Sequence, residues 1–179
     1  HSIVQKLNEE QVADTAASDE EAVLENKIAE YDAFLTKQDP AFTVEELEEA
    51  MQKVMDQYAG GIGTHYQFNE KQLAMAEEKI KKLQILAKGL AAADMHELMF
   101  IYELKERLTV CLTVIAHLRA RKETRWHSFA ENLDYPEKSD AWLCYVNSKK
   151  NGDQITMIRR VLVKGGETYE HRDLFHEMQ

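Results

Sequence analysis

Three consecutive stretches of this sequence repeat apolar residues at alternating spacings of three and four, the period of an α-helix packed on one face. They lie within residues 43–60, 69–89 and 94–121. The apolar positions are Val44, Leu47, Met51, Val54 and Tyr58, then Leu73, Ala76, Ile80, Leu83 and Ala87, then Leu98, Ile101, Leu104, Leu108, Leu112, Ile115 and Leu118. Short connections favour antiparallel neighbours. The pattern predicts a mainly α protein built on an antiparallel three-helix bundle.

Polar residues that stabilise helix ends stand where each stripe begins. Three N-caps are expected at Thr43, Asn69 and Asp94, and Glu46 and Glu97 would complete capping boxes at the first and third. Gly60-Gly61 follows the first stripe, where a left-handed cap is expected to end the helix. These signals predict helix boundaries independently of the periodicity.

The flanking segments have a different character. Residues 1–42 form an acidic segment that we expect to be partly helical, because Val23, Leu24, Ile28, Tyr31 and Leu35 suit an extra helix over about 19–37. Residues 43–136 are predicted to form the bundle. In residues 137–179, strands over 142–146 and 154–161 joined by an Asn151-Gly152 turn predict a β-hairpin, followed by a polar tail. A lone two-stranded ribbon is marginally stable, so we expect it to pack on the bundle.

Charge and composition narrow the classes of partner. Residues 1–58 carry 4 basic and 15 acidic side chains, whereas residues 59–179 carry 18 basic and 17 acidic ones. The acidic first third argues against a nucleic-acid partner, which needs clustered cations. Charges interrupt every long apolar stretch, so no membrane span is expected. Cys111 and Cys144 lack disulfide-framework spacing, and we expect a reducing cytoplasm.

Motifs for catalysis or metal binding are missing from the sequence. The run Gly60-Gly61-Ile62-Gly63 lacks the spacing of a phosphate-binding loop, and the histidines never stand four residues apart as a helical metal pair would. No serine or cysteine lies in a nucleophile motif. We therefore expect no catalytic, cofactor-binding or metal-binding residues in this chain.

The third helix ends in a dense cluster of charge, Arg121-Lys122-Glu123-Thr124-Arg125-Trp126. Burying such charges is costly unless each finds a partner, so a solvated helix end is the simplest interpretation. We favour another, in which Arg121, Glu123 and Arg125 build a fixed ionic corner against another surface, because a guanidinium can hold carboxylates and carbonyls through two bonds. Trp126 and Trp142 would be its packing anchors.

Several motifs together resemble a known family. The runs Asp94-Met95-His96-Glu97-Leu98, Arg121 to Trp126 and Asp134-Tyr135-Pro136 resemble the C-terminal helical domain of the succinate dehydrogenase/fumarate reductase flavoprotein superfamily. Within it, Trp126, the nine-residue gap from Arg125 to Asp134, and the run from Trp142 through Asn147 to Lys149 resemble the alpha (flavoprotein) subunit of dissimilatory adenylylsulfate reductases. Asn132, where these subunits tend to carry Arg, and Ser128-Phe129-Ala130 depart from that pattern.

The resemblance implies a parent protein with FAD in a domain that precedes this chain and a partner subunit with iron–sulfur clusters. Such a parent reduces adenosine 5′-phosphosulfate to sulfite and AMP. This chain would be a non-catalytic part without a cofactor of its own, packing on the flavin domain and touching the iron–sulfur subunit; exposed bundle surface could also let it self-associate. Its expected interface residues are Arg121, Glu123, Arg125, Trp126, Asp134, Trp142 and Asn147.

Two other interpretations stay open from the sequence. A stand-alone helical interaction module would need no enzyme attached. Alternatively, the chain is a domain of a fumarate reductase or succinate dehydrogenase flavoprotein, in the same superfamily but with a different substrate for the parent. Trp126 and the spacing from Arg125 to Asp134 disfavour this interpretation.

Overall fold

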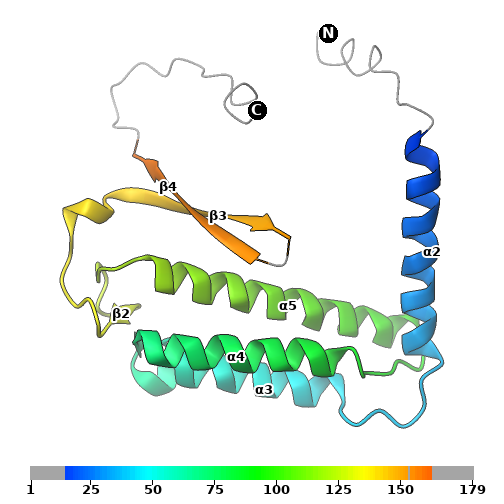
Figure 1. Ribbon diagram of the computed structural model, residues 1–179. Helices are drawn as coiled ribbons and strands as arrows, with labels where there is room; N and C mark the ends of the chain where they lie inside the picture. Colours follow the sequence, from blue (N-terminus) through cyan, green and yellow to red (C-terminus); the bar gives the residue numbers. More distant parts are fainter. Residues whose placement is uncertain (1–14, 153, 163–179) are drawn as a thin grey trace. The chain divides into compact units, whose positions relative to one another are not determined.

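The computed structural model describes residues 15–152 and 154–162 of the chain, which are mainly α-helical (Figure 1). The predicted polar tail from residue 164 and the first 14 residues lie outside this part. The helices are α2 (Thr15–Leu35), α3 (Val44–Tyr58), α4 (Glu70–Ala87) and α5 (Met95–Ala120), with two 3-10 turns, η1 (Ile62–Thr64) and η2 (Asp140–Trp142). The strands are β1 (Gln67–Phe68), β2 (Glu131–Asn132), β3 (Cys144–Asn151) and β4 (Gln154–Val161).

The predicted N-caps of α3, α4 and α5 are confirmed. The Thr43 hydroxyl accepts the Glu46 N–H at 3.2 Å, and the Glu46 carboxylate accepts the Thr43 N–H at 2.9 Å. Asn69 Oδ1 accepts the Gln72 N–H at 2.9 Å. Before α5, Asp94 Oδ1 accepts the Glu97 N–H at 2.9 Å, while the Glu97 carboxylate reaches one residue further back, to the Ala93 N–H. Each cap satisfies N–H groups that the helix leaves unpaired.

Glycines end α3 as expected. Gly60 has a φ of 75°, in the left-handed region where a side chain is strained. A Cβ on Gly61 would lie 2.3 Å from Asp56 Cα, so only glycine lets the chain pass this close to the helix it has just left. The run Gly60-Gly61-Ile62-Gly63 is therefore a cap and turn.

The chain divides into two compact units, and each of the helices α3, α4 and α5 contributes to both. Unit 1 comprises the described residues up to 53 and residues 79–109, and unit 2 comprises residues 54–78 and the described residues from 110 onward. Unit 1 thus gathers the first part of α3, the last part of α4 and the first part of α5. Unit 2 gathers the complementary parts. Each grouping is the one that antiparallel neighbours produce.

The core of each unit is built mainly from the stripes predicted from periodicity, although five predicted positions are only partly buried, namely Val44, Val54, Tyr58, Leu112 and Leu118. In unit 1 the buried apolar residues include Leu47, Met51, Ile80, Leu83, Ala87, Leu98, Ile101, Leu104 and Leu108. In unit 2 they include Phe68, Leu73, Ala76 and Ile115. All five predicted positions of α4 are buried, which confirms its stripe. Burial of such side chains contributes most of the stability of helices this short.

Helix α2 exists, but only the C-terminal part of the stripe expected along it is partly buried. Val23, Leu24 and Ile28 are exposed, and Phe34 is buried instead. The ring of Tyr102 in α5 meets Tyr31 and Phe34 edge-on, with centroids 5.3 and 6.3 Å apart. The Phe34 carbonyl also accepts the Ala92 N–H at 3.0 Å. The C-terminal end of α2 therefore makes these contacts within unit 1. Of the expected stripe, Tyr31 and Leu35 are partly buried, whereas the prediction was wrong for Val23, Leu24 and Ile28.

The C-terminal hairpin is confirmed with shifted ends. Strand β3 begins at Cys144 and pairs antiparallel with β4, from Cys144 opposite Val161 to Asn151 opposite Gln154 (Figure 1). Trp142, which was expected to start the strand, instead lies in η2. Asn151 belongs to the ladder, and Gly152 takes the left-handed conformation with a φ of 59°. The turn therefore starts one residue later than the sequence indicated.

Burial on α4 gives a matched test of the core. Ile80 has no exposed surface, whereas Ile85 on the same helix is 65% exposed. We expect Ile80→Ala to lower the free energy of unfolding by about 2–4 kcal/mol, because it removes buried methyl groups and leaves a cavity. Ile85→Ala should cost less than about 0.5 kcal/mol. Urea denaturation followed by circular dichroism measures both, and equal losses would contradict this assignment of the core.

Candidate functional site

The charge cluster lies in unit 2, directly after the end of α5, and its centre is the carboxylate of Glu123. The Glu123 side chain has no exposed surface, whereas those of Arg121 and Arg125 are 32% and 24% exposed. Burying a carboxylate is unfavourable unless hydrogen bonds replace its water shell. The partners of Glu123 therefore decide whether this arrangement is stable.

Three donors surround the buried carboxylate. Glu123 Oε1 accepts hydrogen bonds from Arg121 Nη1 and Arg125 Nε, each at 2.6 Å. Glu123 Oε2 accepts the backbone N–H of Ser139 at 3.0 Å. The carboxylate is thus charge-balanced by two guanidinium groups and held by a segment sixteen residues further along the chain. We call Arg121, Glu123 and Arg125 the ionic corner.

The two arginines extend this network to backbone carbonyls. Arg121 donates from Nη1 to the Trp142 carbonyl at 2.9 Å and from Nη2 to the Cys144 carbonyl at 3.1 Å. Arg125 donates from Nη2 to the Ser139 carbonyl at 3.0 Å. The ionic corner therefore ties the end of α5 to η2 and to the start of β3, using the several donors of each guanidinium.

The hydrogen bonds keep Glu123 ionised. Burial alone would raise the pKa of Glu123, but the bonds from Arg125, the Ser139 N–H and Arg121 outweigh it, and the pKa lies below its usual 4.5. A depressed carboxyl pKa means that ionised Glu123 stabilises the folded state above about pH 4.5. The carboxylate therefore acts as a fixed charge at neutral pH.

Two buried polar residues next to the corner were not expected from the sequence. The Thr124 hydroxyl accepts the Asn132 N–H at 2.9 Å and donates to the Tyr135 carbonyl at 2.9 Å. Asn132 Oδ1 accepts the N–H of Asp134, two residues further along the chain, at 3.1 Å. Asparagine is a recognisable sequence signal for a turn of this kind. Thr124 and Asn132 therefore fix the course of the loop between the corner and Pro136.

Asp134, an expected interface residue, has a structural contact within unit 2. Its Oδ2 accepts the N–H of Glu70, the first residue of α4, at 2.7 Å. Next to it, β1 pairs in parallel with β2, with Gln67 opposite Glu131 and Phe68 opposite Asn132. A carboxylate at a helix N-terminus satisfies a free N–H and the helix dipole. Asp134 thus joins the loop after the corner to the start of α4.

The other expected interface residues have different surroundings. Trp142 is partly buried and lies under two cations, with the Arg159 and Arg121 guanidinium carbons 4.2 and 5.9 Å from its ring centroid. Trp126 is 72% exposed and packs little against the described chain. Asn147 is exposed in β3, opposite Ile158. Trp142 is an anchor within the chain, whereas a role for Trp126 or Asn147 toward another surface stays a prediction.

A mostly apolar hollow of about 520 Å³ opens beside the ionic corner. We call it the corner pocket, and its lining includes Phe68, Leu118, Arg121, Glu123, Arg125, Trp126, Trp142, Leu143, Tyr145 and Val146. At its rim Leu143 and Tyr145 are 54% and 56% exposed. An apolar hollow with exposed aromatic and aliphatic rims is typical of a surface that receives another protein's side chains.

The arginines and the carboxylate of the ionic corner are engaged with one another and with backbone groups. In the part of the chain that the structure describes, no three His, Cys, Asp or Glu side chains lie close enough together to hold a metal ion. No helix within the described ranges is both long and apolar enough to cross a membrane.

Comparisons with known proteins agree on one family. Residues 48–167 match the family described as the fumarate reductase flavoprotein C-terminal domain. The adenylylsulfate reductase alpha subunit of Megalodesulfovibrio gigas is 34% identical over 98 residues, which are 54% of this chain and 15% of that protein. The chain therefore spans a small part of the length of this relative.

Solved structures give the same result. The adenylylsulfate reductase of Archaeoglobus fulgidus superposes with a TM-score of 0.75 and 32% identity, covering 80% of this chain and 25% of that one. An adenosine-5-phosphosulfate reductase in complex with sulfite gives a TM-score of 0.68 and 34% identity over 76% of this chain and 23% of that one. E. coli quinol fumarate reductase FrdA, at 20% identity and a TM-score of 0.67, shares the fold over 85% of this chain and 26% of its own.

The buried carboxylate yields a direct stability test. In Glu123→Gln the amide NH2 would face donors, because Arg121, Arg125 and the Ser139 N–H all donate to this group. We expect a loss of about 3 kcal/mol in the free energy of unfolding, measured by urea denaturation. The matched control is Glu137→Gln, an exposed carboxylate in the same loop, which should change stability by less than about 0.5 kcal/mol. Equal effects would contradict the role assigned to Glu123.

The depressed pKa of Glu123 sets a pH dependence. Its folded-state pKa lies below 4.5, so its stabilising effect is complete above about pH 4.5 and is lost as pH falls through the folded-state value. The difference in unfolding free energy between wild type and Glu123→Gln should be constant from pH 7 to about 5 and shrink at lower pH. A difference that grows on acidification would contradict the ionised, hydrogen-bonded state of Glu123.

Proposed function

Because the chain belongs to the family of fumarate reductase flavoprotein C-terminal domains, we propose that it is the helical C-terminal part of an adenylylsulfate reductase-like, FAD-dependent oxidoreductase. The parent protein would reduce adenosine 5′-phosphosulfate to sulfite and AMP. The present chain would be a structural and docking part, without a reaction centre of its own.

Identity and coverage support the adenylylsulfate reductase branch. The relatives above 30% identity are adenylylsulfate reductases, and this chain matches 15–25% of their lengths. The fumarate reductase structure, at 20% identity, supports the fold alone. The flavin and the substrate-binding residues would therefore belong to other parts of the parent protein.

One observation supports the docking role: the ionic corner lies beside a hollow whose rim has exposed apolar side chains. The hydrogen bonds of Glu123 and Arg121 join backbone segments from residue 121 to residue 144. On this rigid base stand Trp126, Leu143 and Tyr145, all lining the corner pocket and all exposed. Rigid aromatic and aliphatic side chains around a hollow are the usual anchors of protein interfaces. The flavin domain of the parent chain is the occupant that we propose.

The cofactors of the parent follow from the same proposal. FAD would be bound by the flavin domain, and a separate subunit with iron–sulfur clusters would exchange electrons with it. That subunit is a second partner in the proposal, and a cytoplasmic location would suit both. This chain supplies neither a flavin site nor a cluster site in the proposal.

The docking role predicts that some variants of the corner pocket lose binding affinity without losing stability. Trp126→Ala and Leu143→Ala remove exposed side chains, so each should leave the urea denaturation curve nearly unchanged. Each should weaken binding of this chain to the separately produced flavin domain of its parent at least about tenfold in a calorimetric titration, as interface anchors do. Phe42→Ala, an exposed aromatic in unit 1, is the control and should bind normally. Normal binding by both corner variants would refute the docking role.

The proposed chemistry predicts where flavin binds and which substrate reacts. This chain mixed with FAD should give no stoichiometric yellow complex after gel filtration, whereas the complete parent should retain flavin. Supplied with a reductant, the parent should release sulfite and AMP from adenosine 5′-phosphosulfate and leave fumarate unreduced. Flavin bound to this chain alone would contradict the structural role, and fumarate reduction alone would contradict the substrate assignment.

A further inference from the structure

The first part of α2, in unit 1, has no buried side chain. Every side chain from residue 20 to residue 29 is exposed in the described structure. Val23, Leu24 and Ile28 among them are 68%, 61% and 49% exposed. Helices depend for their stability mainly on packing of an apolar face, so a stretch like this one gains from a partner that covers it.

Carboxylates border that apolar surface. Glu20 and Glu21 stand four and three residues before Leu24, and Glu25 stands three residues before Ile28, so each is a neighbour of an apolar side chain on the helix surface. We call these five residues the α2 stripe. Within the described residues, none of its three carboxylates forms an ion pair.

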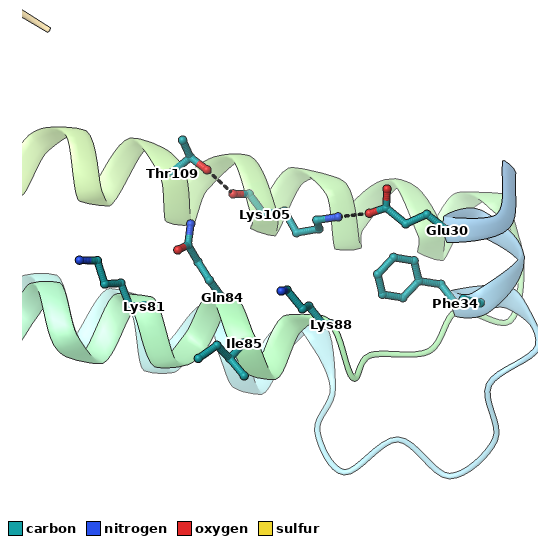
Figure 2. Close-up of a pocket in the computed structure, with 9 residues that line it drawn as sticks. Glu30, Phe34, Lys81, Gln84, Ile85, Lys88, Lys105 and Thr109 are labelled. Carbon is teal, nitrogen blue, oxygen red and sulfur yellow. Dashed lines mark hydrogen bonds and ion pairs between the residues drawn. The ribbon is translucent and has the colours of Figure 1, made fainter. Parts of the chain in front are cut away.

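The acid further along α2 is used differently. Figure 2 shows Lys105 of α5 reaching to Glu30, and Lys27 binds the same carboxylate at 2.7 Å. Glu30 is thus neutralised inside unit 1. The negative charge that α2 presents to a partner therefore comes from the α2 stripe.

The hairpin of unit 2 has an exposed face of the opposite charge. Side chains alternate along a strand, and residues directly opposite each other on paired strands share a face. The register of β3 and β4 therefore places six exposed side chains on one face, which we call the hairpin face: Tyr145, Asn147 and Lys149 opposite Arg160, Ile158 and Thr156.

This face is basic around an apolar centre. Residues 144–152 and 154–162 contain four cations and no carboxylate. Of these cations, Lys149 and Arg160 lie on the hairpin face, and neither forms an ion pair within the described residues. Tyr145 and Ile158, 56% and 41% exposed, supply the apolar surface beside them. A two-stranded ribbon is marginal alone, so covering this face would stabilise it.

We propose that the hairpin face of one copy of this chain docks on the α2 stripe of a second copy. Lys149 and Arg160 would meet the carboxylates of the stripe, and Ile158 would cover its apolar side chains. The two surfaces match in apolar content and are opposite in charge, which is the complementarity that selects a partner.

The contact joins two different surfaces, so it is a head-to-tail contact in which each copy can offer both. Both surfaces are small, and small interfaces give weak, transient association. The pairing does not depend on the substrate or the cofactor of the parent protein.

Sedimentation equilibrium of the 179-residue chain tests whether it associates. The average mass should rise with protein concentration at low ionic strength, and the association should weaken several-fold at about 0.5 M salt, because exposed charge pairs are screened. A single monomeric species up to about 1 mM would overturn the proposal. Association that salt does not weaken would overturn the ionic pairing.

Charge reversal on either surface tests which residues meet. Lys149→Glu/Arg160→Glu and, separately, Glu21→Lys/Glu25→Lys should each weaken self-association at least about tenfold, because like charges would then face each other. All four residues are exposed, so thermal melting should be nearly unchanged. An equimolar mixture of the two variants should associate again, because each offers the charge that the other needs.

The matched control is Lys71→Glu/Lys138→Glu, which reverses two exposed lysines of unit 2 outside the hairpin and gives the same net charge as the hairpin variant. It should associate like the wild type. A control that loses association to the same extent would show a general charge effect and refute the assignment. A mixture of the two reversed variants that stays monomeric would refute it as well.

Discussion

The buried carboxylate of Glu123 is the constraint on which the C-terminal part of unit 2 depends. Once it has no access to water, it must be hydrogen-bonded, and its two oxygens meet two guanidinium groups and one backbone N–H. Those guanidinium groups in turn hold the carbonyls of residues 139, 142 and 144. A two-stranded ribbon, marginal alone, is thereby fastened at its first residue to the end of α5.

Most of the helical architecture could be predicted from the sequence because helix signals are local. Stripes at spacings of three and four are the residues that become buried, and polar caps act within four residues of the helix start. The sequence therefore predicted α3, α4 and α5 and their caps. Helix α2 shows the limit of this reasoning: its stripe is thinner in sequence, and which of its residues are buried depends on where Tyr102 lies.

The candidate site was predictable in part. The density of charge in residues 121–126 indicated that Arg121, Glu123 and Arg125 group together, and the structure places them in one hydrogen-bonded cluster. Their backbone partners could not be predicted, because the carbonyls that accept from the arginines and the Ser139 N–H that donates to Glu123 carry no side-chain signal. Thr124 and Asn132 were missed for a related reason: a buried threonine or asparagine is conspicuous only once the loop around it is known.

Around the ionic corner the charges satisfy one another, which leaves an apolar rim suited to a protein surface.

Amide hydrogen exchange at Ser139 tests the central claim most directly, because its N–H is held by Glu123 and belongs to no helix or strand ladder. If the ionic corner fixes this segment, Ser139 should exchange only in openings that cost nearly as much as opening the buried part of α5. Rapid exchange at Ser139 while the amides around Ile115 stay protected would contradict the account.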